Sequence, residues 1–326
     1  MSGCPFTPLV RVVRTTITAT EAGKQLIDGL SCRFLYLSRE GWQKQIAAGN
    51  VLLNSQCMDA AHVLTAGDQL EFIPRGLEEK AVCWDIEILY EDARFVVVNK
   101  PGNLPCHPAG SFFNHTLWAW LKQMHHMDDV YFVNRIDRET SGVVLIARKS
   151  EDVSLATKLL LEESSTKEYL VLVEGIVSEK YFVAKGWLAQ DHQSEIRKKR
   201  RFYYEREHIP VGDKAEFCKT EFFKVKESAD LSITLLKARL HTGRMHQIRA
   251  TLFSLGYPVV GDKLYGVDDQ LFLKFIHSEL TEEDGRRLRL LRQALHAYRL
   301  KLKLPNEGKE EFIAPYPVEL QELLDY

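Results

Sequence analysis

Cysteine pairs, long apolar runs and an excess of one charge are all missing from this sequence of 326 residues. Its six cysteines include no CxxC pair and follow no disulfide pattern, which predicts a reduced, cytoplasmic chain without a structural zinc site. The longest apolar runs, such as residues 143–147, are too short to cross a bilayer, and residues 1–16 show no secretory signal. We therefore expect a cytoplasmic protein with no membrane-spanning segment.

The balance of charges excludes one further class of protein. The chain has 43 Lys and Arg residues against 45 Asp and Glu residues, so it is not a uniformly basic nucleic-acid coat. A local basic groove remains compatible with this balance. A hydrophobic content of 45% and a charged content of 27% are typical of a globular protein, and the length predicts roughly two domains.

A stretch with proline, glycine and a cluster of charges, residues 74–82, is the candidate linker. The residues before it predict a small αβ module of about 65 residues. The expected strands in this module are 11–18, 51–54 and 68–73, and the expected helices follow the apolar spacing from Leu26 to Leu37 and from Ser38 to Gly49.

The residues after the linker predict strands in adjacent pairs as well as strands that alternate with helices. This order favours an α+β domain over a doubly wound parallel sheet. Strands are expected in the segment 88–99 and at 143–147, 168–174, 215–225 and 231–239, and helices at 115–125, 151–163, 244–255 and 318–325.

The most informative stretch is residues 134–142, in which four charges, a polar pair and a glycine lead directly into an apolar strand. In an extended chain, Arg135 and Asp137 would point to the same side. On composition alone, a solvated turn before a buried strand is the better interpretation.

Two later segments carry polar side chains beside apolar strands. Residues 167–175 predict a central strand, because both of its faces are apolar, and Tyr169 alone would be interpreted as a core aromatic. In residues 240–249, a Thr-Gly turn is expected to open a helix that carries Arg244, His246 and Arg249 and whose N-terminus could hold an anion. His241 and His246 have no Asp or Glu among them, so hydrogen-bonded structural roles are favoured over a zinc site.

These three segments, followed by GDKLYG at 261–266, resemble the RluA family of RNA pseudouridine synthases. The family pattern is HRLD-x-x-TSG, K-x-Y, TGR-x-HQ(I/L)R and GD-x-x-YG, and this chain has NRIDRETSG, KEYLVLV, TGRMHQIR and GDKLYG in the same order. The resemblance covers roughly residues 85–326. It implies an α+β catalytic domain of the pseudouridine-synthase type, with a mixed, largely antiparallel central sheet.

The N-terminal module resembles the S4 RNA-binding domain, through LSREGWQKQIAAGNVLLN and the later GDQLEF. We therefore expect an S4-like module over 1–75, a linker over 76–84 and a catalytic domain over 85–326. In S4 domains the second helix faces RNA, which makes Arg39 and Lys44 candidate RNA contacts.

The resemblance implies an enzyme that isomerises uridine in RNA. The N1–C1′ bond breaks, the base turns over, and C5 is joined to C1′, so no cofactor or metal is required. The catalytic role is implied for Asp137, as a nucleophile or as a base towards the sugar. Arg249 would be its partner and would favour the ionised carboxylate. Tyr169 would stack on the target uracil, and Arg135 would occupy the gap that the flipped base leaves.

Two departures from the family pattern stand out. The family usually has His before the Arg of the first motif, whereas this chain has Asn134, whose amide can hold the loop or bind RNA but cannot titrate. The acidic-then-basic stretch 278–292 looks longer than the usual connection. Its arginines, 286, 287, 289 and 292, are interpreted as a solvated face.

RNA is the expected partner, and large-subunit ribosomal RNA is favoured over tRNA. The clearest basic run is flanked by aromatic residues and could follow a phosphate backbone, although a solvated loop explains it equally well. This run consists of Arg197, Lys198, Lys199, Arg200 and Arg201.

Two alternatives remain open, and a monomer is expected in each case. The first is an RNA-binding or ribosome-assembly protein of the same fold. The second is a glycoside or nucleoside hydrolase, which would need a second carboxylate facing Asp137 across its substrate. Glu139 is the nearest in sequence, but an extended chain would not turn it towards Asp137.

Overall fold

The computed structural model of this chain describes residues 4–34, 36–277, 279–305 and 311–325. The first three residues of the expected S4-like module, Ser278 of the acidic-then-basic stretch, and residues 306–310 and 326 of the expected catalytic domain lie outside the described residues. Among the described residues, no helix is both long enough and apolar enough to cross a bilayer.

The contacts divide the chain into two units. One unit contains Met1–Val82 and Pro105–Asp128, and the other contains Cys83–Leu104 and Asp129–Tyr326. Residues 105–128 thus group with the N-terminal residues, although the sequence analysis assigned them to the catalytic domain. The domain boundaries stay a prediction.

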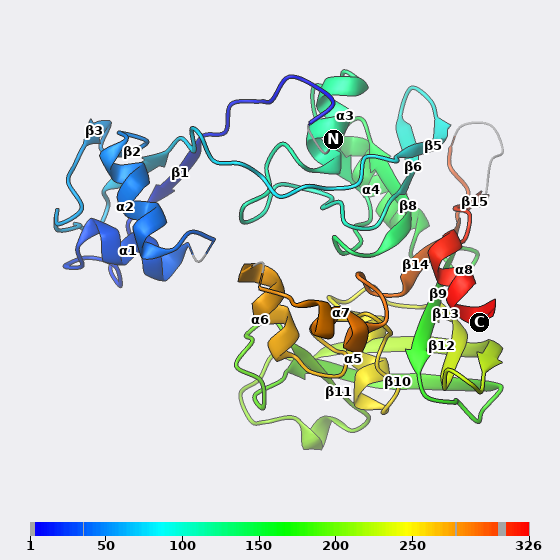
Figure 1. The fold of residues 1–326 in the computed structure, drawn as a ribbon. Coiled ribbons are helices and arrows are strands. Elements are labelled where there is room, and N and C mark those ends of the chain that lie inside the picture. Colours follow the sequence, from blue (N-terminus) through cyan, green and yellow to red (C-terminus); the bar gives the residue numbers. More distant parts are fainter. Residues whose placement is uncertain (1–3, 35, 278, 306–310, 326) are drawn as a thin grey trace. The chain divides into compact units, whose positions relative to one another are not determined.

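The first unit contains a four-stranded sheet with two helices. Trp42 is completely buried in its core, where its indole nitrogen donates a hydrogen bond to the carbonyl of Phe34 at 3.1 Å and its ring meets that of Phe72. The second helix begins after Ser38 as predicted, and Ser38 caps it, because its side chain accepts a hydrogen bond from the N–H of Gly41. The elements are β1 (Val13–Thr16), α1 (Leu26–Arg33), α2 (Arg39–Ala47), β2 (Val51–Leu53), β3 (Gln56–Cys57) and β4 (Gln69–Phe72), and the sheet order is β1-β4-β2-β3 (Figure 1).

The predicted linker carries a carboxylate that organises residues 113–115. Glu79 accepts hydrogen bonds from the backbone N–H groups of Phe113, Asn114 and His115 at 2.6, 2.8 and 2.9 Å. The helix α3 (Leu117–Met124) follows directly and is capped by Thr116. These bonds explain why residues 105–128 group with the N-terminal unit.

The second unit is built on a sheet of eleven strands. Its strands are β5 (Glu87–Glu91), β6 (Phe95–Lys100), β7 (Tyr131–Phe132), β8 (Ser141–Ala147), β9 (Thr166–Glu174), β10 (Tyr181–Gln190), β11 (Arg200–Tyr203), β12 (Glu216–Ser228), β13 (Ile233–Leu240), β14 (Leu295–Lys301) and β15 (Glu311–Ile313). The main order is β11-β10-β12-β13-β9-β14-β8-β6-β5, with β15 on β14 and β7 on β8. The pair β8–β14 is parallel, whereas the other pairs among the described strands are antiparallel. The predicted α+β class with a mixed, largely antiparallel sheet is therefore confirmed.

Strand β9 lies at the centre of this sheet, as its two apolar faces predicted. It pairs with β13 on one side and β14 on the other, and Val171, Leu172 and Val173 are completely buried. The helices of this unit are α4 (Ser150–Leu159), α5 (Gln247–Ser254), α6 (Gln270–His277), α7 (Glu282–Leu288) and α8 (Val318–Asp325), and a 3-10 turn covers Arg206–His208. Helix α5 packs against β10 and β11.

One expectation about a helix is corrected, and two further helices are found. The helix expected over 244–255 begins only at Gln247, because the Gln247 carboxamide accepts hydrogen bonds from the Arg244 N–H and the Thr242 hydroxyl and so closes the turn before it. Arg244 and His246 therefore lie outside the helix. The sequence analysis named no helix after GDKLYG, where the chain forms α6 and, within the stretch 278–292, α7; Thr281 and Asp284 form a capping box for α7.

The parallel pairing of β8 with β14 leaves no room for a side chain at Gly142. Its φ is +114°, and a Cβ atom there would lie 2.2 Å from the carbonyl oxygen of Ala297. We expect Gly142→Ala to lower the free energy of unfolding by about 2 to 4 kcal/mol, through backbone strain and steric overlap. Urea denaturation followed by circular dichroism measures the change.

A matched control is Gly285→Ala, within α7, where a Cβ atom would meet nothing within 4 Å. Because alanine favours a helix over glycine by about 0.5 to 1 kcal/mol, this variant should be as stable as the wild type or slightly more so. Equal urea midpoints for Gly142→Ala and the wild type would contradict the steric argument.

Candidate active site

The first motif forms a loop between β7 and β8, and two polar side chains hold it. The Asn134 carboxamide donates to the carbonyl of Val143 at 3.3 Å and accepts from the N–H of Leu145 at 2.7 Å. The completely buried ammonium of Lys100 donates to the carbonyls of Leu104 and Arg138 at 2.8 and 3.2 Å. Asn134 thus holds the loop, which is one of the two roles that the sequence left open for it.

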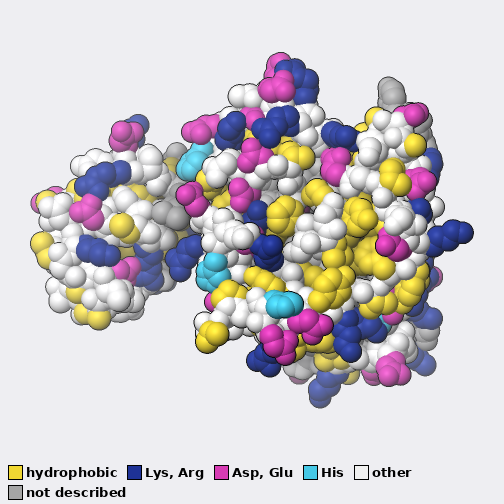
Figure 2. Space-filling view, turned by 90° about the horizontal axis from the view of Figure 1, so that it is seen from below, with side chains coloured by type: hydrophobic (Ala, Val, Ile, Leu, Met, Phe, Trp, Pro, Cys, Tyr) yellow, Lys and Arg dark blue, Asp and Glu magenta, His cyan; other side chains and the backbone are white. Residues whose placement is uncertain are grey.

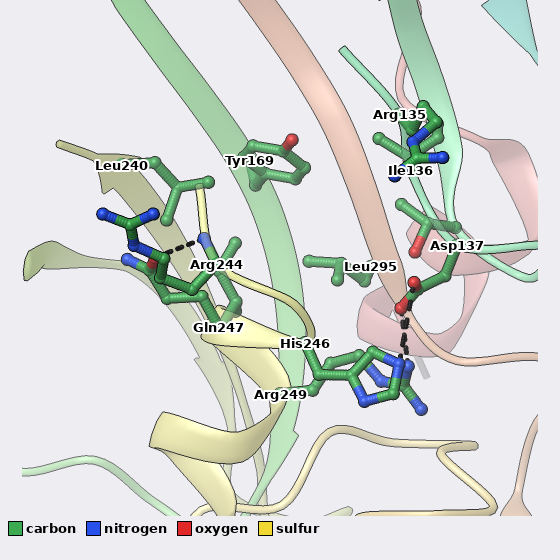
Figure 3. A pocket seen from close by; sticks show the side chains of 12 residues that line it. Arg135, Ile136, Asp137, Tyr169, Leu240, Arg244, His246, Gln247, Arg249 and Leu295 are labelled. Carbon is green, nitrogen blue, oxygen red and sulfur yellow. Dashed lines mark hydrogen bonds and ion pairs between the residues drawn. The ribbon is translucent and has the colours of Figure 1, made fainter. Parts of the chain in front are cut away.

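The structure brings Asp137, Tyr169, Arg249 and Arg135 to one pocket, although they are up to 114 positions apart in sequence (Figure 3). Tyr169 reaches the pocket from β9, Arg249 from α5, and the other two from the loop before β8. The remaining lining residues are Ile136, Thr140, Leu240, Arg244, His246, Gln247, Ile248 and Leu295.

A buried guanidinium joins two carboxylates beside this pocket. Arg249 donates from Nη1 to Oδ2 of Asp137 at 2.5 Å, and from Nε and Nη2 to the two oxygens of Asp262 at 2.6 and 2.8 Å. Arg249 is 7% exposed and Asp262 is completely buried. Asp262 also accepts hydrogen bonds from the N–H groups of Leu264 and Tyr265, both at 2.9 Å. The turn GDKLYG therefore fixes the direction in which Arg249 points.

The environment of Asp137 keeps its carboxylate ionised. Burial alone would raise the pKa of Asp137, but the charge and hydrogen bond of Arg249 outweigh it and lower the pKa to about 2. Gln293 adds a contact to the same oxygen, Oδ2, at 3.5 Å. In the described part of the chain, Oδ1 accepts no hydrogen bond, so this oxygen is available to a substrate.

His246 lies next to Asp137, a position that the sequence analysis did not give it. Its Nδ1 is 2.9 Å from the hydroxyl of Tyr265, and its Nε2 is 3.9 Å from Oδ1 of Asp137. His241 contacts Glu221 instead, with 3.2 Å between Nε2 and Oε1, so the two imidazoles have separate partners. Nowhere in the described ranges do three or more His, Cys, Asp or Glu side chains gather in a way that could hold a metal ion.

Comparison with known proteins identifies the family. A family model described as RNA pseudouridylate synthase matches residues 94–254. An uncharacterized RNA pseudouridine synthase of Bacillus subtilis, YlyB, is 28% identical over 95% of this chain and 96% of its own length. Ribosomal large subunit pseudouridine synthase D of Salmonella typhimurium is 29% identical over 95% of this chain and 92% of its own length.

The chain belongs to the RNA pseudouridine synthase family. The fold agrees, since the solved structure of human RNA Pseudouridylate Synthase Domain Containing 1 matches 73% of this chain and 86% of its own with a TM-score of 0.55, at 24% identity. The family match includes Asp137, Tyr169 and Arg249, whereas Asp262 lies beyond its last matched residue.

In this pseudouridine synthase, the predicted basic run does not form one continuous surface. Arg197 is exposed, whereas Lys199 is buried and its ammonium contacts Asp269 at 3.0 Å. Lys198 lies 3.9 Å from the centre of the Phe272 ring, and burial and the Arg249 charge lower its pKa to about 8. Arg200 and Arg201 begin strand β11.

The other predicted RNA contacts lie on helix α2 of the first unit. Arg39 forms an ion pair with Asp28, and Lys44 is exposed. Both side chains lie at the surface of this unit, and their contact with RNA stays a prediction.

Besides His246 in the pocket, the sequence analysis missed residues that support the pocket residues from behind. Asp262 lies in the recognised segment GDKLYG but was given no role there, and Lys100 lies outside the four motif segments. Charged residues next to glycine and apolar residues were the available signal in both cases.

The Asp137–Arg249 contact predicts the titration of Asp137. In the double variant Arg249→Met with Asp262→Asn, which leaves no unpaired buried carboxylate behind Arg249, burial should raise the pKa of Asp137 above its ordinary value. Carbon-13 NMR of the Asp137 carboxyl group measures this pKa. Arg249→Lys is the control, since its positive charge should keep the pKa low, and an unchanged pKa in the double variant would contradict the assignment.

Proposed function

We propose that this pseudouridine synthase converts uridine to pseudouridine in large-subunit ribosomal RNA, with Asp137 as the catalytic residue. The observation that carries the proposal is an ionised carboxylate, held by Arg249, in a pocket that also contains the Tyr169 ring. The similarity to Ribosomal large subunit pseudouridine synthase D over nearly the whole chain supports ribosomal RNA as the substrate.

The free oxygen of Asp137 acts on the nucleoside in this proposal. Because Oδ2 is engaged by Arg249 and Gln293, Oδ1 is the oxygen that attacks C1′ as a nucleophile or removes a sugar proton as a base. Either role needs the ionised form, which a pKa of about 2 maintains at neutral pH.

Tyr169 and Arg135 handle the base in this proposal. A target uridine in folded RNA must leave its stack, at a cost of a few kcal/mol. Tyr169 supplies a ring in the pocket on which uracil stacks. Arg135 is exposed and lines the same pocket two residues from Asp137, so its planar guanidinium can occupy the vacated stack.

RNA beyond the pocket would contact Arg197, Lys198, Arg200 and Arg201, and also Arg39 and Lys44. Lys199 is left out of this set because it is buried and its ammonium already has a partner in Asp269. On the face that Figure 2 shows, Lys and Arg side chains alternate with acidic and apolar ones, so contact is expected at limited patches and not over a whole basic face.

The main alternatives are tRNA as the substrate and an RNA-binding or ribosome-assembly protein of the same fold. The hydrolase alternative loses support, since Asp137 is the one carboxylate among the described residues that line the pocket. Glu139 pairs with Lys263 at 2.7 Å, and Asp262 pairs with Arg249, so neither is free to act from across a substrate.

Tritium release tests the reaction, since joining C5 to C1′ expels the hydrogen from C5. We expect the wild type to release tritium from ribosomal RNA labelled at uridine C5, and Asp137→Asn to release none. The assay is run separately on ribosomal RNA and tRNA. Release from tRNA alone would show that tRNA, and not ribosomal RNA, is the substrate. No release from either RNA would favour the RNA-binding alternative.

The basic run predicts a salt-dependent contribution to RNA affinity. Replacing Arg197 and Arg201 together with Ala should weaken binding and reduce the slope of log affinity against log salt by about 0.7 to 0.9 for each lost phosphate contact. Fluorescence anisotropy with labelled ribosomal RNA measures both quantities.

The matched control removes the same charge from helix α7. Arg286 and Arg287 pair there with Glu283 and Asp268. Replacing these two arginines with Ala should leave the salt slope unchanged. Equal effects of the two double variants would show that net charge alone, and not the basic run, determines the affinity.

A further inference from the structure

The hydroxyl of Tyr265 determines which nitrogen of His246 carries a proton. Tyr265 is completely buried, and its oxygen accepts a hydrogen bond from the backbone N–H of Arg200 at 2.9 Å. The second partner of this oxygen is Nδ1 of His246, also at 2.9 Å. If Nδ1 donated as well, the single hydroxyl hydrogen would have no acceptor in the described part of the chain, which is costly for a buried group. The hydroxyl therefore donates to Nδ1.

An imidazole whose Nδ1 accepts a hydrogen bond carries its proton on Nε2 when it is neutral. Burial and then the charge of Arg249 lower the pKa of His246 to about 4. Asp137 and Asp262 oppose this shift and Lys198 adds to it, so all four charged neighbours are included in the balance. The ring is neutral at pH 7 and presents an N–H group on its Nε2 side.

This N–H group faces the part of the pocket where Asp137 acts. Nε2 is 3.9 Å from Oδ1 of Asp137, which is too long for a hydrogen bond, so the donor is not consumed by the carboxylate (Figure 3). In a uridine, C1′ is bonded to N1 and O2 to the adjacent ring atom C2. Because Oδ1 of Asp137 and Nε2 of His246 are 3.9 Å apart, Oδ1 can reach C1′ while Nε2 reaches O2 of the same uridine.

We propose that His246 is a second catalytic residue, which donates a hydrogen bond from Nε2 to O2 of the reacting uracil. This proposal rests on the proposed function. When the N1–C1′ bond breaks, its electron pair stays on uracil and spreads over N1, O2 and O4. A fixed donor at O2 stabilises that charge, and the imidazole keeps its proton throughout. After C5 joins C1′, C5 loses one hydrogen and N1 gains one, so the reaction remains redox-neutral.

Nitrogen-15 NMR of histidine-labelled wild type tests the first half of the proposal without any variant. In the wild type, we expect His246 to show a protonated Nε2 and an unprotonated Nδ1 from pH 5 to 8. In Tyr265→Phe, we expect His246 to lose this fixed tautomer. A protonated Nδ1, or a ring that gains a second proton within this range, would overturn the proposal.

Tritium release under steady-state conditions tests the second half. His246→Asn is the informative variant, because the backbone at 246 has a φ of +57° that Asn tolerates, while its short amide cannot reach O2. We expect kcat to fall about 100-fold, as for the loss of one oxyanion donor, with little change in KM for RNA. Tyr265→Phe should lower kcat less than His246→Asn does, because the His246 imidazole is still present in that variant.

His192→Asn is the control, since this exposed imidazole pairs with Asp213 outside the pocket. Its kcat should equal that of the wild type. Equal kcat for His246→Asn and the wild type, or a change in KM alone, would overturn the catalytic role of His246. Absence of release by the wild type itself would instead overturn the proposed function and with it the role at O2, while the NMR result would still decide the tautomer.

Discussion

The site depends on one buried guanidinium that serves two carboxylates. Arg249 could not remain buried with Asp137 as its sole partner, because the remaining N–H groups would lose their hydrogen bonds to water. Asp262 accepts from two of them and is itself satisfied by two backbone N–H groups. Removing one member of such a buried pair commonly costs about 3 to 5 kcal/mol. The charge that keeps Asp137 ionised is thus supported by a residue that has no direct contact with the pocket.

The same arrangement divides the two oxygens of Asp137 between structure and chemistry. Oδ2 is held by Arg249 and Gln293, which fixes the side chain, and Oδ1 faces the pocket beside His246. His246 is fixed in turn by Tyr265, which accepts a hydrogen bond from the first residue of β11. Strand β11, which carries part of the basic run, is therefore connected to the pocket by a chain of hydrogen bonds. This chain runs from the N–H of Arg200 through the hydroxyl of Tyr265 to the imidazole of His246.

Much of this could be predicted from the sequence, from local pattern for the strands and from the family resemblance for the site. The two apolar faces of residues 168–174 predicted the central strand, and the resemblance to a known family implied that Asp137, Tyr169 and Arg249 belong to one site. Contacts across long sequence separations that the family motifs do not include could not be predicted in this way. Lys199 is buried by an ion pair with Asp269, 70 residues further on, and nothing near Lys199 in sequence indicates that. Helix α5 begins only at Gln247 because the Gln247 side chain accepts hydrogen bonds from Thr242 and Arg244, so these residues form a turn before the helix. The spacing of apolar residues does not predict such side-chain hydrogen bonds.

The bonds of Glu79 bear on how the protein can be divided. The chain leaves the first unit after Val82, returns to it at Pro105 and leaves again after Asp128. A fragment that begins at residue 85 would keep Phe113, Asn114 and His115 but would lose the carboxylate that accepts from all three of their N–H groups. The four motifs of the pseudouridine synthase pattern all lie within that fragment, yet its first forty residues would include a segment separated from its folding partners. The domain boundary that the sequence motifs indicate therefore differs from the boundary between the two compact units of this protein.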